Sequence, residues 1–360
     1  MGTKYEFLKE RFSHWLGENG GGAVVAVSPE NVLHTSGAYI ASQRMIRDRL
    51  AMTIYPAEGE AAFLVGDVVH RTAKADSWIE DTRAYAEHHQ TPMEGLAEIL
   101  RENGLARSRI ALETRYLPAE SYLELVRELP DAVFFDAEEI LDETRMIKSA
   151  DEIDLMRRNA IAAEKAIEYG YLFSRPGDTE RQVVARMRRA LLELGGEWNP
   201  FITLAAGTAN TLEGHHVAGD KPILPGEILR VDMVGFWRGY YTDFARMAVV
   251  EEPSKAQREL YHPVVHVQRH VMEAARPGVR ACDLYQACAD YSQQIGMSLD
   301  VNLIGHSLGI GLHEYPVLGP TYEKPLAANM TLCIEIASRV PDLGMFHVED
   351  LILVTQDGYE

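Results

Sequence analysis

Charged side chains interrupt apolar segments in the last third of the sequence, and this restricts the possible folds more than any other feature. Five acids or imidazoles stand in or beside such runs: Asp232, Asp243, His306, Glu335 and Glu349. Burying these groups is costly unless something compensates for the lost water. Four carboxylates at one point would repel one another, and a pair of divalent cations would turn that repulsion into binding. The pattern therefore predicts strands that meet around metal ions.

The first two acids, Asp232 and Asp243, fall on a predicted hairpin. Segments 228–233 and 240–249 have strand character, and the turn 237–239 joins them. Inward-facing acids on the two strands of a hairpin can converge on one site. A lone pair of such acids is more often solvated surface, so this hairpin alone does not establish a metal site.

The other two acids, Glu335 and Glu349, fall on a second predicted hairpin, formed by 331–337 and 345–355. Two hairpins with two acids each, together with His306, can build a two-metal site with bridging carboxylates. The mixed oxygen and nitrogen ligands suit Mn(II), Co(II), Fe(II) or Zn(II) better than Ca(II) or Mg(II) alone. Periodicity by itself leaves this interpretation and the surface alternative about equal.

Two further histidine motifs lie near these hairpins. His215 and His216 form a glycine-flanked pair before the first hairpin, and His313 follows His306 in a glycine-rich segment. Several glycines around His313 indicate a close approach of the backbone. Imidazoles near an activated water can hold substrate and transfer protons, although a doubled histidine on a loop is often incidental.

Length and composition limit the class of protein. A chain of 360 residues exceeds one ordinary core, so two domains are expected. The net charge of -19 argues against nucleic acid and anionic membranes as partners. The three cysteines form no CxxC motif, which indicates a reduced, cytoplasmic setting. No run approaches about 18 apolar residues, so no transmembrane helix is expected, and the start of the sequence does not predict a signal peptide.

The first part of the chain alternates between predicted strands and helices, which indicates an α/β domain with a mixed sheet. The expected helices are 5–16, 93–103 and 118–129, and the expected strands are 23–27, 31–36, 50–55, 61–65 and 109–112.

A capping box, Ser149 with Glu152, opens a long amphipathic helix at 151–173. We place the domain boundary near residue 146. Further helices are expected from Thr179 or Asp178 to Leu194, and at 254–274 and 281–295.

Residues 146–356 resemble the pita-bread metallopeptidase family (M24), in its creatinase, prolidase and aminopeptidase P branch. The match includes the Gly-His-x-x-Gly-x-x-x-His-Glu motif at 305–314, and the N-terminal part and the linker 145–152 are similar too. The resemblance implies an α+β protein. It would have an α/β creatinase/prolidase-like domain over 1–145 and a pita-bread catalytic domain over 146–360.

The resemblance also implies roles for the site residues. The ligands of two divalent metal ions (Mn, Co, Fe or Zn) would be Asp232, Asp243, His306, Glu335 and Glu349, with Asp243 and Glu349 bridging. His215 and His313 would contact the substrate and, with Glu335, manage protons. A metal-bridging hydroxide would attack an N-terminal amide bond, as in Xaa-Pro dipeptides or peptides. A homodimer is expected, in which the N-terminal domain of one subunit closes the active site of the other.

Three departures from the family pattern concern the substrate. Ala245 stands where a threonine is common, Ile336 where a proline is usual and His347 where an arginine is usual. We expect His347 to bind substrate, with a titratable ring in place of a permanent charge. Two alternatives remain: a hydrolase or lyase of a small non-peptide metabolite, such as an ectoine-type amide, and a catalytically inactive binding module. The complete ligand set disfavours the second of these, and also creatine hydrolysis, which uses no metal in this family.

Overall fold

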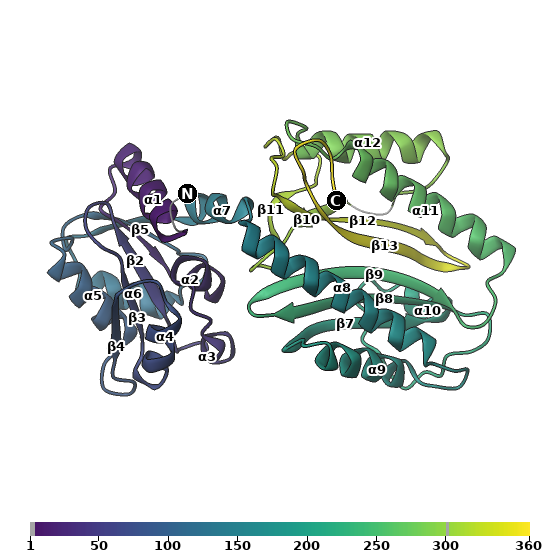
Figure 1. Cartoon of the computed structure of the whole chain (residues 1–360), viewed down its shortest axis with the longest axis horizontal. Helices are drawn as coiled ribbons and strands as arrows, with labels where there is room; N and C mark the ends of the chain where they lie inside the picture. Colours follow the sequence, from purple (N-terminus) through teal and green to yellow (C-terminus); the bar gives the residue numbers. More distant parts are fainter. Residues whose placement is uncertain (1–3, 300–301) are drawn as a thin grey trace. The chain divides into compact units, whose positions relative to one another are not determined.

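The computed structural model describes residues 4–299 and 302–360 (Figure 1). The chain divides into two compact units, Met1–Arg145 and Met146–Glu360. In the described part of the chain, no helix combines the length and the apolarity that crossing a membrane requires.

The first unit is built on a mixed sheet with the strand order β4-β3-β2-β1-β5-β6. Its central strand, β1, pairs antiparallel with β2 and parallel with β5, which confirms the expected α/β arrangement. The strands are β1 (Ala23–Ala26), β2 (Met52–Pro56), β3 (Ala62–Gly66), β4 (Asp81–Tyr85), β5 (Arg109–Leu112) and β6 (Val133–Asp136).

Helices cover both faces of this sheet, because successive strand residues point to opposite sides. On β1, Val24 joins an apolar cluster with α1, and Val25 joins a second cluster with α5. The helices are α1 (Lys4–Asn19), α2 (Pro29–Ser36), α3 (Ala41–Met45), α4 (His70–Asp76), α5 (Pro92–Glu102), α6 (Ala119–Glu128) and α7 (Glu138–Met146).

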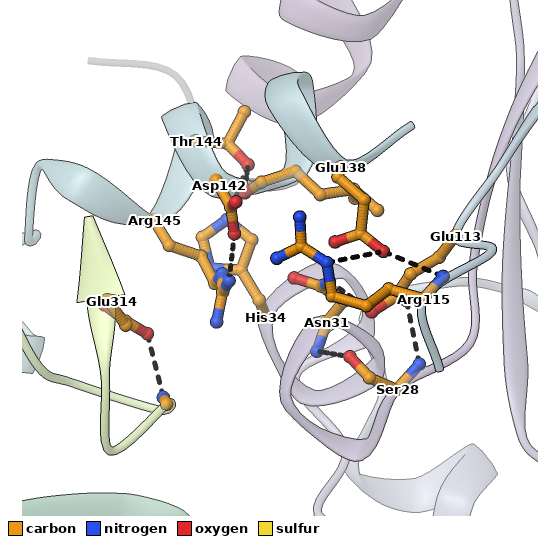
Figure 2. A network of polar contacts seen from close by, with 12 residues as sticks. Ser28, Asn31, His34, Glu113, Arg115, Glu138, Asp142, Thr144, Arg145 and Glu314 are labelled. Carbon is orange, nitrogen blue, oxygen red and sulfur yellow. Dashed lines mark hydrogen bonds and ion pairs between the residues drawn. The ribbon is translucent and has the colours of Figure 1, made fainter. Parts of the chain in front are cut away.

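The prediction of a strand at 31–36 is wrong, because this segment lies in α2. The Ser28 hydroxyl accepts a hydrogen bond from the backbone N–H of Asn31, and Pro29 occupies the first turn, where its missing N–H costs nothing. Figure 2 shows the buried Glu113 carboxylate beside Ser28 and Asn31, from which it accepts two hydrogen bonds. These contacts fix a helix that the β-rich composition of the segment conceals.

The second unit is built on a sheet with the order β11-β10-β12-β13-β9-β8-β7, in which neighbouring strands pair antiparallel. Both predicted hairpins are present, as β8–β9 and β12–β13. The strands are β7 (Trp198–Ala206), β8 (Ile228–Trp237), β9 (Tyr240–Val249), β10 (Gly305–Ser307), β11 (Glu314–Val317), β12 (Thr331–Val340) and β13 (Gly344–Leu353).

The helices predicted for this unit are confirmed, and the capping boxes at Ser149 and Thr179 open α8 and α9. The helices are α8 (Ala150–Leu172), α9 (Glu180–Glu193), α10 (Gly207–Thr211), α11 (Lys255–Ala274) and α12 (Ala281–Gln294). In Figure 1, α8 and α9 lie along β7–β9, whereas α11 lies along β12 and β13 and packs against α12.

Alternation along the strands separates an apolar face of this sheet from a polar one. Val231 and Phe244 pack in the cluster that includes α8 and α9, whereas Ile336 and Val348 pack in the cluster that includes α11 and α12. The sequence neighbours of these four residues are the four predicted carboxylate ligands, Asp232, Asp243, Glu335 and Glu349. Because successive strand residues point to opposite sides, these ligands lie on the other face of the sheet.

Candidate metal centre

A single row of paired residues crosses four strands of the second sheet and carries three carboxylates. Asp232 on β8 is opposite Ala245 on β9, and Ala245 is opposite Glu349 on β13. Glu349 is in turn opposite Glu335 on β12. Residues directly opposite one another share a face of the sheet, so the three carboxylates do too. The small Ala245 side chain separates two of them and leaves room at the centre of the row.

The two remaining predicted ligands lie on the same face. Asp243 precedes Ala245 by two positions, and His306 on β10 is opposite Cys333, which precedes Glu335 by two positions. The two-residue period of a strand keeps such side chains on one side. Gly305, with φ +141°, lets β10 approach this closely, because a Cβ there would lie 1.9 Å from the Cys333 carbonyl oxygen.

Two groups of potential metal ligands result, and Glu349 belongs to both. The ligand atoms of Asp243, His306 and Glu349 lie within 4.8 Å of one another, and so do those of Glu335, His347 and Glu349. The structure thus brings four of the five predicted ligands into these groups. The fifth predicted ligand, Asp232, lies in the row with Glu349. Its charge helps to raise the pKa of both Asp243 and Glu349.

The buried carboxylates show why a cation fits here. Burial, and then the charges of the neighbouring acids, raise the pKa of Asp243 and of Glu349 well above the ordinary values. Burial also raises the pKa of Asp232. One oxygen of Asp243, Oδ1, is buried without a hydrogen-bond partner in the described residues. Buried polar atoms normally have a partner, and a divalent cation would supply one for these oxygens.

The surroundings of His306 favour its neutral form, which is the form that binds a metal ion. Burial and the neighbouring His313 lower its pKa. Its Nδ1 lies 3.0 Å from the Ser307 carbonyl oxygen, which can only accept, so Nδ1 carries the proton and Nε2 keeps its lone pair. For Glu335, burial would raise the pKa, but the surrounding histidines, with His347 first, bring it below the ordinary value.

The two histidines expected to meet substrate are both exposed. His313 stacks on the ligand His306, with ring centroids 3.8 Å apart. His215 lies edge-on to Phe201 at 5.2 Å and acts electrostatically on Asp232. The adjacent His216 has a different role, because its Nε2 lies 3.0 Å from a carboxylate oxygen of Glu180.

Residues that the sequence did not single out hold the His215 segment. Glu180 is fully buried, and its carboxylate accepts from the backbone N–H groups of Ala206 and Gly219 as well as from Asn210. Arg230, also buried, donates through Nη2 to the carbonyls of Glu213 and Gly214. An arginine within the apolar strand β8 was a usable signal. The sequence around Glu180 contains no comparable signal, because the residues that Glu180 contacts are distant from it in the chain.

A buried ion pair supports the segment between His306 and His313. Lys148 Nζ lies 3.0 Å from Glu314 Oε2, and each side chain is 3% exposed. Lys148 Nζ also contacts Ser307 Oγ at 3.2 Å, and the other Glu314 oxygen accepts from the backbone N–H of Gly311. The pair therefore links the start of α8 to both ends of this segment.

The three departures from the family pattern lie in different surroundings. Ala245 and His347 are on the polar face beside the carboxylates. Ile336 points the other way, into the core with α11 and α12, and is fully buried. The Ile336 side chain therefore does not face the predicted metal ligands.

Comparisons with known proteins agree with this architecture. Residues 154–356 match metallopeptidase family M24, and residues 9–147 match the Creatinase/Prolidase N-terminal domain. An Xaa-Pro dipeptidase of Pyrococcus horikoshii is 29% identical over 243 residues, which cover 67% of this chain and 69% of the relative.

Solved structures share the fold over nearly the whole chain. A dipeptidase from Pyrococcus horikoshii has a TM-score of 0.87 at 27% identity, covering 98% of this chain and 96% of its own. A prolidase from Pyrococcus furiosus has a TM-score of 0.85 at 25% identity, covering 97% and 98% respectively. The two units are thus a creatinase-type N-terminal domain and a pita-bread domain.

Proposed function

We propose, because the chain belongs to metallopeptidase family M24, that it is a dinuclear metal-dependent hydrolase that cleaves the N-terminal amide bond of Xaa-Pro dipeptides or short peptides. The observation that carries the proposal is the pair of ligand groups that share Glu349. A carboxylate common to two groups is the arrangement that a bridged pair of ions requires.

Asp243 and Glu349 would bridge the ions, and Asp232, His306 and Glu335 would complete the ligand set. Bound divalent ions supply Lewis acidity toward an amide carbonyl and lower the pKa of water. The ligand chemistry fits Mn(II), Co(II), Fe(II) or Zn(II), since the donors are carboxylates and imidazole.

The chain's own residues then orient the amide and move protons. His313 and His215 are exposed beside the buried ligands, so both can reach the substrate carbonyl or the leaving nitrogen. Glu335, only partly buried and with a lowered pKa, is ionised at neutral pH and can accept a proton. Relatives named Xaa-Pro dipeptidase support proline as the residue after the cleaved bond.

A small non-peptide amide is the alternative substrate. It is favoured by Ala245, which stands at the centre of the carboxylate row where the family commonly has threonine, and by His347 nearby. The resemblance further supports a homodimer, which light scattering on the purified protein would test. The free state of Cys282, Cys288 and Cys333 fits the cytoplasmic setting that the sequence predicts.

The test is turnover by the Mn(II)-loaded protein on Ala-Pro, a longer Xaa-Pro peptide and acetylated diamino acids, with and without a chelator. We expect chelator-sensitive release of proline from Ala-Pro, and the longer peptide separates a dipeptidase from an aminopeptidase. If metals bind but the Xaa-Pro bond is cleaved in neither peptide, as shown by release of neither the N-terminal residue nor proline, the peptidase proposal fails. Cleavage of an acetylated diamino acid would then support the small-amide alternative.

A further inference from the structure

His347 is a buried imidazole that the described residues leave incompletely partnered. His347 is 4% exposed, and its Nδ1 is buried without a hydrogen-bond partner in the described residues. Nε2 lies 3.7 Å from Glu335 Oε2, which is longer than a hydrogen bond. Nε2, which faces Glu335 at this distance, is therefore available to a cation that the carboxylate also binds.

The surroundings of His347 are those of a metal ligand. Its ligand atom lies within 4.8 Å of those of Glu335 and Glu349, and all three share the polar face of the β12–β13 hairpin. Atoms bound to one ion at about 2.0–2.2 Å lie about 3–4 Å from each other. The distance of 3.7 Å between His347 Nε2 and Glu335 Oε2 therefore fits two atoms that bind the same ion.

The location of His347 disfavours the substrate contact that the sequence suggested. His215 and His313 are exposed, whereas His347 is buried and lies opposite the small Ala337 in the hairpin. With so little exposed surface, His347 is less accessible to a substrate than the two exposed histidines are.

We propose that His347 is a metal ligand, which binds through Nε2 the ion held by Glu335 and Glu349. Each ion of the pair then carries one imidazole, His306 on one and His347 on the other. This inference rests on the proposed two-metal centre. An added nitrogen ligand favours Zn(II) or Co(II) over Mn(II) at that position, since imidazole suits the former and all-oxygen sites the latter.

X-ray absorption spectroscopy on the zinc-loaded protein tests the inference, because it counts imidazoles for each zinc ion. We expect one imidazole per zinc in the wild type, and one for every two zinc ions in His347→Gln. The matched control is His266→Gln, which changes an exposed histidine on α11 and should leave the count unchanged. Zinc affinity of His347→Gln should fall by about tenfold or more, with a smaller change for manganese.

Elemental analysis of the same samples separates the two proposals. Fewer than two zinc ions per wild-type chain overturns the two-metal centre and this inference with it. Two zinc ions with one imidazole between them in the wild type overturns the role of His347 alone. The wild-type count decides this even if His347→Gln does not fold. An unchanged count in a folded His347→Gln variant overturns it as well.

Discussion

Asp243 and Glu349 are two buried acids whose folded pKa values lie well above the ordinary ones. An acid of this kind is more easily ionised in the unfolded chain. The contribution of these two acids to the stability of the metal-free protein is therefore fully present below the ordinary carboxyl pKa of about 4, and it is lost as the pH rises through their folded pKa values. Bound cations remove this penalty, so the site favours metal binding over the stability of the empty protein.

Asp243→Asn should separate metal binding from stability. Replacing a proposed bridging carboxylate by an amide should abolish tight binding of the metal pair, as measured by elemental analysis. The same change removes a group whose ionised form burial disfavours, so the unfolding free energy of the metal-free protein at neutral pH should rise. Denaturant unfolding from pH 5 to 8, with about 2 mM chelator present, measures this and should show a weaker pH dependence than in the wild type.

Asp342→Asn, in the exposed turn between β12 and β13, is the matched control and should change neither quantity. Two metal ions per chain in Asp243→Asn would contradict the ligand assignment. An unchanged pH dependence would contradict the electrostatic account of the empty site.

The site acids were predictable because they interrupt apolar strands, which is a local signal. Glu180 and Arg230 escaped prediction because their importance comes from contacts with the His215 segment, which only the fold creates. His347 was noticed only as a departure from a family pattern, and its relation to Glu335 follows from strand register.

The start of α8 and the segment between His306 and His313 are joined by the buried pair Lys148 and Glu314. Removing one partner of a buried pair leaves an uncompensated charge and typically costs about 3–5 kcal/mol, whereas replacing both by apolar groups is often neutral. Lys148→Met should therefore destabilise the protein by about that amount, and Lys148→Met with Glu314→Leu by clearly less. Denaturant unfolding of the two variants and of Glu314→Leu completes the cycle.

The pair has a matched control in Arg181 and Asp220, which are also 3.0 Å apart but exposed. Removing Arg181 should cost less than about 1 kcal/mol. Additive effects of the Lys148 and Glu314 changes would show that the two side chains are not coupled.

The starts of helices were the most predictable features, because a capping box consists of residues close together in the sequence, as at Ser149 and Thr179. The α2 segment resembles a strand in its β-branched residues Val32 and Thr35, but Ser28 and Pro29 form a helix start signal that prevails. Short strands such as β4 and β6 were not predicted. They pair at or near the edges of the sheet, and their burial alternates incompletely.

The whole molecule consists of two units with separate apolar clusters, and within the described residues the potential metal ligands lie in the second unit. Calorimetry should therefore show two unfolding transitions. Saturating metal should raise the transition of Met146–Glu360 alone, since a ligand at about 100 times its Kd stabilises by about 2.7 kcal/mol. Equal shifts of both transitions would contradict this, and Asp243→Asn should remove the shift.

The row from Asp232 through Ala245 and Glu349 to Glu335 depends on strand register. A side chain replaced within the row changes one contact, but a residue deleted between Glu335 and Glu349 moves one acid to the apolar face. The centre should therefore tolerate changes of residue type in its hairpins far better than changes of strand length. Chain length between the ligands, more than the identity of the residues there, therefore determines whether the centre can form.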